Sequence, residues 1–479
     1  MTAFSRAPGP RGRDFLRTLL RRRRDPLAMQ RHLTRSYGDI VYVQMGSMNQ
    51  FLLNDPAAVW HVLVENAQNY TKGPGYELLS SLLGRGLVTS EGDHWRRHRK
   101  LVQPVLHRER LVVFARAMAE AVAEEGDELA AAARRGETVD MFQHMSELAL
   151  RIIARTVLGS DVRDREAEVH HAAGIVFDRV ELLSVSRLRY LELLPGGNRL
   201  RWILRAASAL PTPGRKRFDE AIATLNDVIY DVVARRRSQG IGPDGPSDLV
   251  GVLLRASDAE RAEGPGFSDE DLRDEVMTMF VAGHETVATT LTWAFYLLAL
   301  HPEYQRQIRE EANEVLGDRA PTFADLPQLR TAERVFKEAL RLYPAIWRFS
   351  RWAVGPDRLG GYDVPAGSVV TISPYLLHRN PAYWSDPEVF DPSRFEADDS
   401  PEPPRGVYIP FGAGRRMCPG ASFGTAEAQI VLSTLCRRVA FEVPPGFEPR
   451  FEPRIALRPR GGMPLRLKPA NSRSLLPTT

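Results

Sequence analysis

PFGAGRRMCPG, residues 410–420, places one of the chain's two cysteines in a glycine-rich turn directly before an apolar segment with helical spacing. The positive end of that helix, free backbone N–H groups and the adjacent Arg415 and Arg416 would favour a thiolate at Cys418. A thiolate of this kind can ligate a soft metal, and haem iron held by cysteine is the case that activates oxygen. The alternative is an ordinary buried cysteine in a loop, which is the usual environment of a cysteine taken at random.

The turn also matches a longer sequence pattern with five fixed positions, F-x-x-G-x-R-x-C-x-G. On Phe411, Gly414, Arg416, Cys418 and Gly420 the chain resembles the cytochrome P-450 family of haem-thiolate monooxygenases, in its soluble bacterial form. The resemblance implies haem b (iron protoporphyrin IX), with Cys418 as the axial ligand of the iron and Phe411 and Gly414 beside the cofactor. It implies a mainly α fold, a single large helical domain with small marginal β-sheets and haem between a long central helix and the helix after Cys418.

A long central helix is predicted independently from residues 269–300. Ser268 and Asp271 form a capping-box signature, and no proline or glycine cluster follows before His301-Pro302. A helix of about 32 residues would be roughly 48 Å long. Its middle is apolar nearly all round, so it should cross the interior of one large domain. Mostly helical patterns fill residues 56–238 and continue to about 343, and strands are expected near 40–53, 361–372 and 440–468.

Within that helix, AGHET at residues 282–286 sets ionisable groups and a hydroxyl among apolar neighbours. An unpaired buried carboxylate costs several kcal/mol, and glycine in a helix interior costs about 1 kcal/mol relative to alanine. A polar network to neighbouring helices would explain His284, whereas Gly283 indicates a local opening of the helix and close approach of a ligand. The segment resembles the family motif A-G-x-(D/E)-T. By that resemblance Thr286 and Glu285 assist proton delivery to dioxygen, and Ala282 and Gly283 shape the oxygen pocket.

Glu338 and Arg341 lie three residues apart on one predicted helix face, a pairing that is common on solvated helices. They resemble the family's E-x-x-R pair, which joins an arginine from a later proline-rich loop. Asp391-Pro392-Ser393-Arg394-Phe395 supplies Arg394, although Ser393 stands where the family usually has glutamate. The resemblance implies a structural triad, not a catalytic one.

The two haem propionates require cationic or strong hydrogen-bonding partners. Trp95 and Arg99 resemble the family's W-x-x-x-R helix, and Arg351 and Arg416 fall where members place further propionate partners. The alternative for residues 94–100 is a solvated basic face, which we expect to hold for Arg96, Arg97 and Lys100. An acidic redox partner could dock on those cations together with Arg415.

By family analogy, the substrate contacts come from residues 76–88 and 177–188, the central helix and residues 345–349. The candidates there are mostly apolar and predict a lipophilic substrate: Tyr76, Leu79, Leu83, Val88, Val287, Ala345 and Ile346.

Composition sets the remaining expectations. Two cysteines and no run of 18 apolar residues favour a soluble, cytoplasmic protein without a transmembrane segment. Residues 11–24 hold seven arginines against one acid, but a single aromatic residue there argues against nucleic-acid binding. We expect a basic leader over residues 1–36, a haem-thiolate monooxygenase domain over 37–468, a tail over 469–479 and a monomeric state.

The expected reaction is insertion of one oxygen atom from O2 into a lipophilic molecule of secondary metabolism, by hydroxylation or epoxidation. Terpenoid, fatty-acid-like and polyketide-like substrates all fit. No room is left after the last expected strand for a flavin or iron–sulfur domain, so electrons would pass from NAD(P)H through a reductase and a ferredoxin or flavodoxin. The alternatives are a peroxide-using or rearranging haem-thiolate enzyme and, in another class, a haem-binding sensor. Intact Glu285 and Thr286 argue against both.

Overall fold

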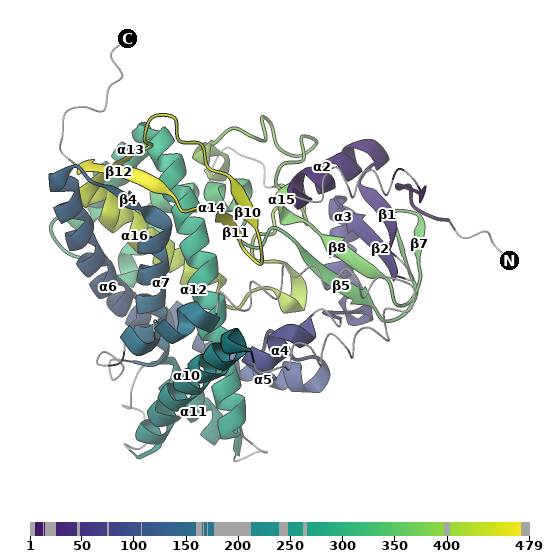
Figure 1. The fold of residues 1–479 in the computed structure, drawn as a ribbon, viewed down its shortest axis with the longest axis horizontal. Helices are drawn as coiled ribbons and strands as arrows, with labels where there is room; N and C mark the ends of the chain where they lie inside the picture. Colours follow the sequence, from purple (N-terminus) through teal and green to yellow (C-terminus); the bar gives the residue numbers. More distant parts are fainter. Residues whose placement is uncertain are drawn as a thin grey trace, which may run out of the picture.

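Helices make up most of the molecule, and the short strands form small sheets (Figure 1). The computed structural model describes residues 5–12, 14, 25–45, 48–73, 76–106, 108–159, 165, 167–169, 171–176, 212–238, 248–261, 266–396 and 403–470. The described α-helices are α2 (Pro26–Tyr37), α3 (Pro56–Trp60), α4 (Glu77–Leu83), α5 (Gly92–Val105), α6 (Arg108–Arg135), α7 (Met141–Val157), α10 (Pro213–Ser238), α11 (Leu249–Arg261), α12 (Asp269–Leu300), α13 (Pro302–Leu316), α14 (Arg330–Leu342), α15 (Pro374–Leu377) and α16 (Ala421–Arg438). Short helical turns include η1 (His61–Glu65), η2 (Ala67–Asn69), η6 (Phe323–Gln328), η7 (Pro392–Phe395) and η8 (Gly414–Arg416).

The strands form small sheets, and the largest lies on one side of the helical body, beside α2 and α3 (Figure 1). Its order is β1-β2-β8-β5-β3, in which β2 and β8 run parallel and the other neighbours antiparallel. Two further hairpin-like pairs, β6–β7 and β10–β11, and a three-stranded sheet β4-β12-β9 complete the described strands. The strands are β1 (Ile40–Met45), β2 (Met48–Leu53), β3 (Tyr70–Thr71), β4 (Thr138–Asp140), β5 (Phe349–Ala353), β6 (Asp357–Leu359), β7 (Tyr362–Val364), β8 (Val369–Ile372), β9 (Val439–Glu442), β10 (Phe451–Pro453), β11 (Leu457–Pro459) and β12 (Pro464–Pro469).

Helix α12 crosses the helical body with α7 and α16 beside it (Figure 1). It has 32 residues, as the sequence predicts, and begins with the predicted capping box. The Ser268 hydroxyl accepts the Asp271 N–H at 3.0 Å, and the Asp271 carboxylate accepts the Ser268 N–H at 3.0 Å. Farther along, the buried Trp293 donates its indole N–H to the Leu457 carbonyl at 2.7 Å, which ties α12 to β11. The mainly α fold class with small marginal sheets is therefore confirmed.

Part of the expected leader belongs to the core. Leu27 and Leu33 of α2 are buried in one apolar cluster with Trp347 and Tyr375. The arginine run at residues 21–24 and the expected substrate segment 177–188 lie outside the described residues. Among the described residues, no helix combines the length and apolar character that a membrane crossing requires.

Candidate active site

Cys418 lies in the turn between η8 and α16, where the sequence places it. Its backbone N–H donates to the Phe411 carbonyl at 2.9 Å, which closes the turn. Gly414 adopts φ = 67°, and a Cβ there would lie 2.1 Å from the Leu63 carbonyl oxygen, so only glycine fits. Phe411 is partly buried against the main core. The turn is thus fixed by backbone contacts that leave the cysteine exposed.

The expected low pKa of the Cys418 thiol is not what the structure supports. Although Cys418 is exposed to solvent, enough protein surrounds its sulfur that burial raises the pKa of the thiol, against the opposing effects of a hydrogen bond from the Gly420 N–H and of the Arg99 charge. The neighbouring arginines turn elsewhere: Arg415 donates to the Ala67 carbonyl at 2.6 Å, and Arg416 to the Ser90 carbonyl at 3.0 Å. A bound metal ion deprotonates a coordinating thiol outright. The environment therefore suits a metal ligand better than a free nucleophile.

The predicted propionate partners converge beside this turn. Arg99 donates to the Met417 carbonyl at 2.9 Å, and the Arg416 guanidinium lies 3.9 Å from the Trp95 ring centroid. Helix α5 thereby holds Trp95 and Arg99 against the cysteine turn, as the shared i, i+4 face requires. Arg351 on β5 belongs to the same group, because its charge lowers the pKa of Arg416.

Lys72, which follows β3, also joins this group although the sequence analysis missed it. Burial, then the charges of Arg416 and Arg351, lower the pKa of Lys72 to about 7. Burial, together with Arg351, likewise lowers the pKa of Arg416 to about 10, while Glu91 opposes the shift. A lysine outside any motif gives no sequence signal, and only the pairing of β3 with β5 brings Lys72 to the site.

Lys72, Arg99, Arg351 and Arg416 form a cation cluster whose charges bear on whether the site can hold haem. Glu91 pairs with Arg416 and accepts the backbone N–H of Lys72 at 2.9 Å, and repulsion among Lys72, Arg351 and Arg416 adds to burial in lowering the pKa values of Lys72 and Arg416. A group carrying two carboxylates would relieve that repulsion through charge-assisted hydrogen bonds. With an exposed cysteine next to it, the cluster fits a cofactor that offers both a soft metal and two propionates.

The AGHET motif of α12, residues 282–286, is accessible to solvent on one face of the helix. Ala282 is exposed and Thr286 half-buried, one turn apart on the same face, and the Thr286 hydroxyl donates to the Ala282 carbonyl at 2.8 Å. The His284 side chain faces helix α7, where it donates to the Ser146 carbonyl at 3.1 Å. A polar contact with a neighbouring helix therefore explains this residue. Glu285 pairs with Arg458 of β11, with 2.6 Å between Oε1 and Nε. Sequence reasoning missed Arg458, because its partner lies 173 positions away.

The role expected for Gly283 differs in the structure. Helix α12 is continuous through this position, so no local opening is present. A Cβ on Gly283 would lie 2.7 Å from Ile153 Cδ1 of α7. The missing side chain therefore lets two buried helices approach closely.

The structural triad comes together around a buried pair. Glu338 and Arg341 are fully buried, with 2.6 Å between Oε2 and Nε. Arg341 also donates to three carbonyls, those of His378, Pro387 and Val389, at 2.7–3.0 Å. Arg394 is looser, because its Nε lies 3.7 Å from Glu338 and its guanidinium bonds Ser385 and Asp386.

The expected substrate contacts divide into two groups. Leu83, Val287 and Ala345 are buried, and Leu79, Val88 and Ile346 are partly accessible. Tyr76 differs from both, because its ring lies 5.3 Å from the Lys72 ammonium and it interacts with Arg351. Its neighbours are therefore those of the cation cluster.

Comparison with known proteins agrees with this geometry. The family model for cytochrome P450 matches residues 8–465. Cyclooctatin synthase of Streptomyces melanosporofaciens is 36% identical over 436 residues, 91% of this chain and 89% of that protein. Cyclooctat-9-en-7-ol 5-monooxygenase of the same organism is 34% identical over 412 residues, 86% of this chain and 84% of that protein. The crystal structure of the cytochrome P450DA haem domain superposes with a TM-score of 0.80 at 24% identity, covering 97% of this chain and 98% of that chain, which shows the shared fold. The chain therefore belongs to the cytochrome P450 family of haem-dependent, oxygen-using oxidoreductases.

Proposed function

We propose that the protein is a monooxygenase that hydroxylates or epoxidises a terpenoid-type molecule at a haem held by Cys418. The observation that carries the proposal is the exposed cysteine of a rigid turn beside a half-buried cluster of cations. Electrons would come from NAD(P)H through a reductase and a separate ferredoxin or flavodoxin.

Haem supplies the activation of dioxygen when it is bound. The chain's own residues would hold it and manage protons around it. Cys418 Sγ would ligate the iron, with the Gly420 N–H and Arg99 stabilising the sulfur charge. Lys72, Arg99, Arg351 and Arg416 would bind the propionates. Thr286, at the accessible edge of α12, would hold a proton donor near the oxygen-binding face, and Glu285 would supply the proton while Arg458 restrains its side chain.

The substrate class rests on two supports. The name of one relative states oxidation of an alkenol, cyclooctat-9-en-7-ol, at carbon 5. The partly accessible candidates Leu79, Val88 and Ile346 are apolar and offer no charge to anchor a carboxylate. A compact, largely hydrocarbon molecule of terpenoid type fits both better than a fatty acid does.

The test is spectroscopic first and chemical second. The ferrous carbon monoxide complex should show the strongly red-shifted Soret band of thiolate ligation, and Cys418→Ala should lose it together with activity. Cys436→Ala is the matched control, because Cys436 is fully buried in α16. With isotopically labelled dioxygen, an acidic ferredoxin, its reductase and a panel of terpene hydrocarbons and alcohols, one labelled atom should enter the product. Product formed only with peroxide would support the peroxide-using alternative, and haem binding without turnover would support the sensor.

A further inference from the structure

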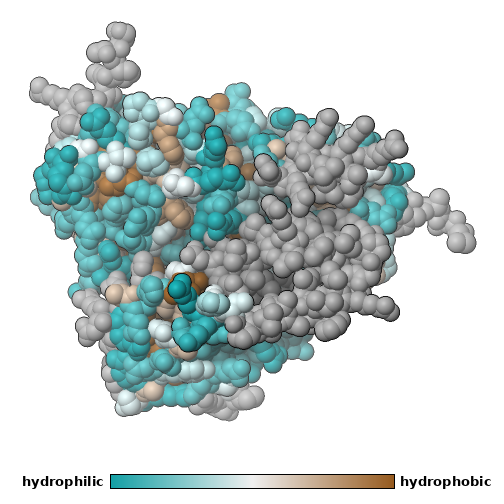
Figure 2. All heavy atoms as spheres, viewed as in Figure 1, coloured by the Kyte–Doolittle hydropathy of each residue, from teal (hydrophilic) through white to brown (hydrophobic). Residues whose placement is uncertain are grey.

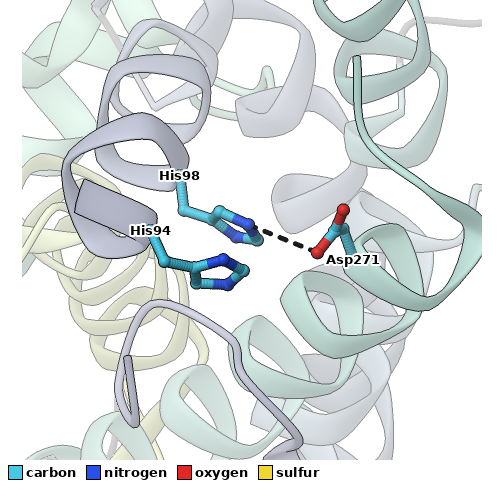
Figure 3. A group of neighbouring side chains, drawn as sticks. All are labelled: His94, His98 and Asp271. Carbon is cyan, nitrogen blue, oxygen red and sulfur yellow. Dashed lines mark ion pairs between the residues drawn. The ribbon is translucent and has the colours of Figure 1, made fainter. Parts of the chain in front are cut away.

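Two histidines of α5 and an aspartate of α12 converge at a place that the proposed chemistry does not use. Figure 3 shows the rings of His94 and His98 stacked one above the other, with Asp271 reaching toward His98 from the first turn of α12. The ring centroids lie 3.9 Å apart. One ligand atom from each of the three residues lies within 4.8 Å of the others.

His98 is fully buried. Its Nδ1 lies 2.6 Å from Glu275 Oε1, and in the tautomer that donates from Nδ1 to this carboxylate the lone pair is on Nε2. That nitrogen has no hydrogen-bond partner among the described residues, and Asp271 Oδ1 lies 3.4 Å away from it. A carboxylate that holds one ring nitrogen while the other is left to a metal is the usual arrangement at metal-binding histidines.

His94 and Asp271 are each also held by a hydrogen bond at one polar atom of the side chain. His94 Nε2 donates to the Arg85 carbonyl at 3.0 Å, which leaves the lone pair on Nδ1. Asp271 uses Oδ2 for the capping box of α12, where it accepts from the N–H and hydroxyl of Ser268. Oδ1 is the oxygen turned toward His98. Each residue thus has one atom engaged in the fold and one that can bind a cation.

We propose that His94, His98 and Asp271 form a zinc site that links α5 to the start of α12. Two ligands at about 2.0–2.1 Å from a tetrahedral ion are about 3.4 Å apart. His98 Nε2 and Asp271 Oδ1 are separated by 3.4 Å. Two imidazoles and one carboxylate suit Zn²⁺, with water as the fourth ligand. His94 is half-buried and Asp271 is 21% exposed, so an ion can enter from solvent.

A second histidine–carboxylate group, Glu125, Glu128 and His144, is a weaker candidate. His144 Nδ1 already lies 2.7 Å from Glu125 Oε1, and the Arg151 guanidinium lies 3.5 Å from Glu125 Oε2. A cation there would displace an ion pair and meet the arginine charge. This group therefore serves as an internal control.

The zinc site would have a structural role. Helix α5 carries Trp95 and Arg99, which contact the cysteine turn, and α12 carries Thr286. A metal bond between the two helices would fix α5 relative to α12. It would raise the melting temperature without contributing to the chemical step.

The test is zinc binding to the haem-loaded protein, freed of any polyhistidine tag and stripped with a chelator. Calorimetric titration with zinc chloride should give one ion per chain, with a higher melting temperature. His94→Gln and Asp271→Asn should each weaken binding about tenfold or more, and Glu275→Gln about 10–100-fold through its hold on His98. Glu128→Gln should leave the affinity unchanged. Absorption at the zinc edge should show imidazole and oxygen ligands and no sulfur.

Three results would overturn the proposal. Wild-type protein that takes up no zinc would show that His98 merely bridges Glu275 and Asp271 as a proton-bearing link. Binding that survives both His94→Gln and Asp271→Asn would place the ion elsewhere. Sulfur in the zinc shell would point to a cysteine. Because His94 and Asp271 are accessible and their variants keep the size of the side chain, misfolding should not obscure these results.

Discussion

At the scale of single residues, Thr286 offers the clearest test of proton delivery. Its hydroxyl donates to the Ala282 carbonyl, so its oxygen remains able to accept a hydrogen bond at the accessible edge of α12. General acid assistance is worth about 10²–10⁴-fold in rate. Thr286→Ala should keep the haem spectrum but lower the product formed per electron about tenfold or more, with hydrogen peroxide released instead.

The matched control is Thr292→Ala on the same helix. Thr292 makes the same kind of hydrogen bond, to the Ala288 carbonyl at 2.7 Å, but is fully buried. Its variant should stay coupled, and Thr286→Ser should keep most of the coupling. Coupled turnover in Thr286→Ala, measured as product against NAD(P)H consumed, would contradict the relay.

The lowered pKa of Lys72 predicts that haem affinity depends on pH. Its pKa of about 7 in the protein lies below the ordinary 10.5, so the free site is increasingly neutral above pH 7. Propionate binding favours the charged ammonium, so haem uptake must bind a proton there, and affinity must fall as pH rises from about 7 to 10. The loss can reach about tenfold per pH unit. Haem transfer to an acceptor apoprotein, measured from pH 7 to 9, should show this slope in the wild type.

Lys72→Met should bind haem less tightly at pH 7 and lose the slope, whereas Lys100→Met, at an exposed position of α5, should keep it. An unchanged slope in Lys72→Met would assign the proton to another group.

Residues held within one local element were identified from fixed spacing, whereas Arg351 and Arg394 were identified only through the family resemblance. Cys418 and its glycines lie in one turn, and Trp95 with Arg99 in one helix, so fixed spacing is enough to find them. Lys72 and Arg458 reach the site only through strand pairing and a hydrogen bond across 173 positions. The thiol's raised pKa was missed for a related reason, since burial and the directions taken by Arg415 and Arg416 depend on tertiary contacts.

At the scale of elements, the buried pair on α14 should be a major source of stability. Glu338→Gln would leave the Arg341 charge buried with only carbonyl partners, and removing one member of such a pair costs about 3–5 kcal/mol. Glu333→Gln on the same helix is the control, because Glu333 and Lys337 are about one-third exposed. That change should cost about 1 kcal/mol or less.

Urea unfolding of the haem-loaded proteins, followed by circular dichroism, measures both changes. If Glu338→Gln lowered the free energy of unfolding no more than Glu333→Gln does, the triad would have no structural role. The loss of unfolding free energy in Arg394→Met should lie between those of Glu338→Gln and Glu333→Gln, because the ion pair of Arg394 with Glu338 spans 3.7 Å.

Elements with local start and stop signals were predicted well, and sheet topology was not. The capping box and His301-Pro302 delimit α12, so its 32 residues follow from the sequence. The parallel pairing of β2 with β8 joins Gln50 to Val369, and no local pattern specifies a partner so distant. Helix α2 was assigned to a leader for a similar reason, since the cluster that buries Leu27 includes Trp347 and Tyr375.

At the scale of the whole molecule, surface charge should govern the encounter with an electron donor. The described surface visible in Figure 2 is mostly hydrophilic, with apolar side chains in small separate patches. Arg96, Lys100 and Arg415 are exposed, although Arg96 also pairs with Asp93 and Arg415 donates to the Ala67 carbonyl. Arg97 donates to the Gly266 carbonyl at 2.6 Å and is half-buried, so it is less available to a partner than the sequence indicated.

We expect an acidic ferredoxin or flavodoxin to dock on Arg96, Lys100 and Arg415. Charge complementarity mainly raises the association rate and is screened over about 10 Å at 0.1 M salt. Donor-driven reduction, followed by stopped flow, should slow as salt rises, and Arg96→Glu with Lys100→Glu should slow it further at low salt. Lys216→Glu, an exposed charge reversal on α10, should have little effect. Peroxide-driven turnover should be the same in all three proteins, because it needs no donor. If the double reversal left low-salt reduction as fast as Lys216→Glu does, these cations would be solvated side chains only, and the donor would have to bind another face.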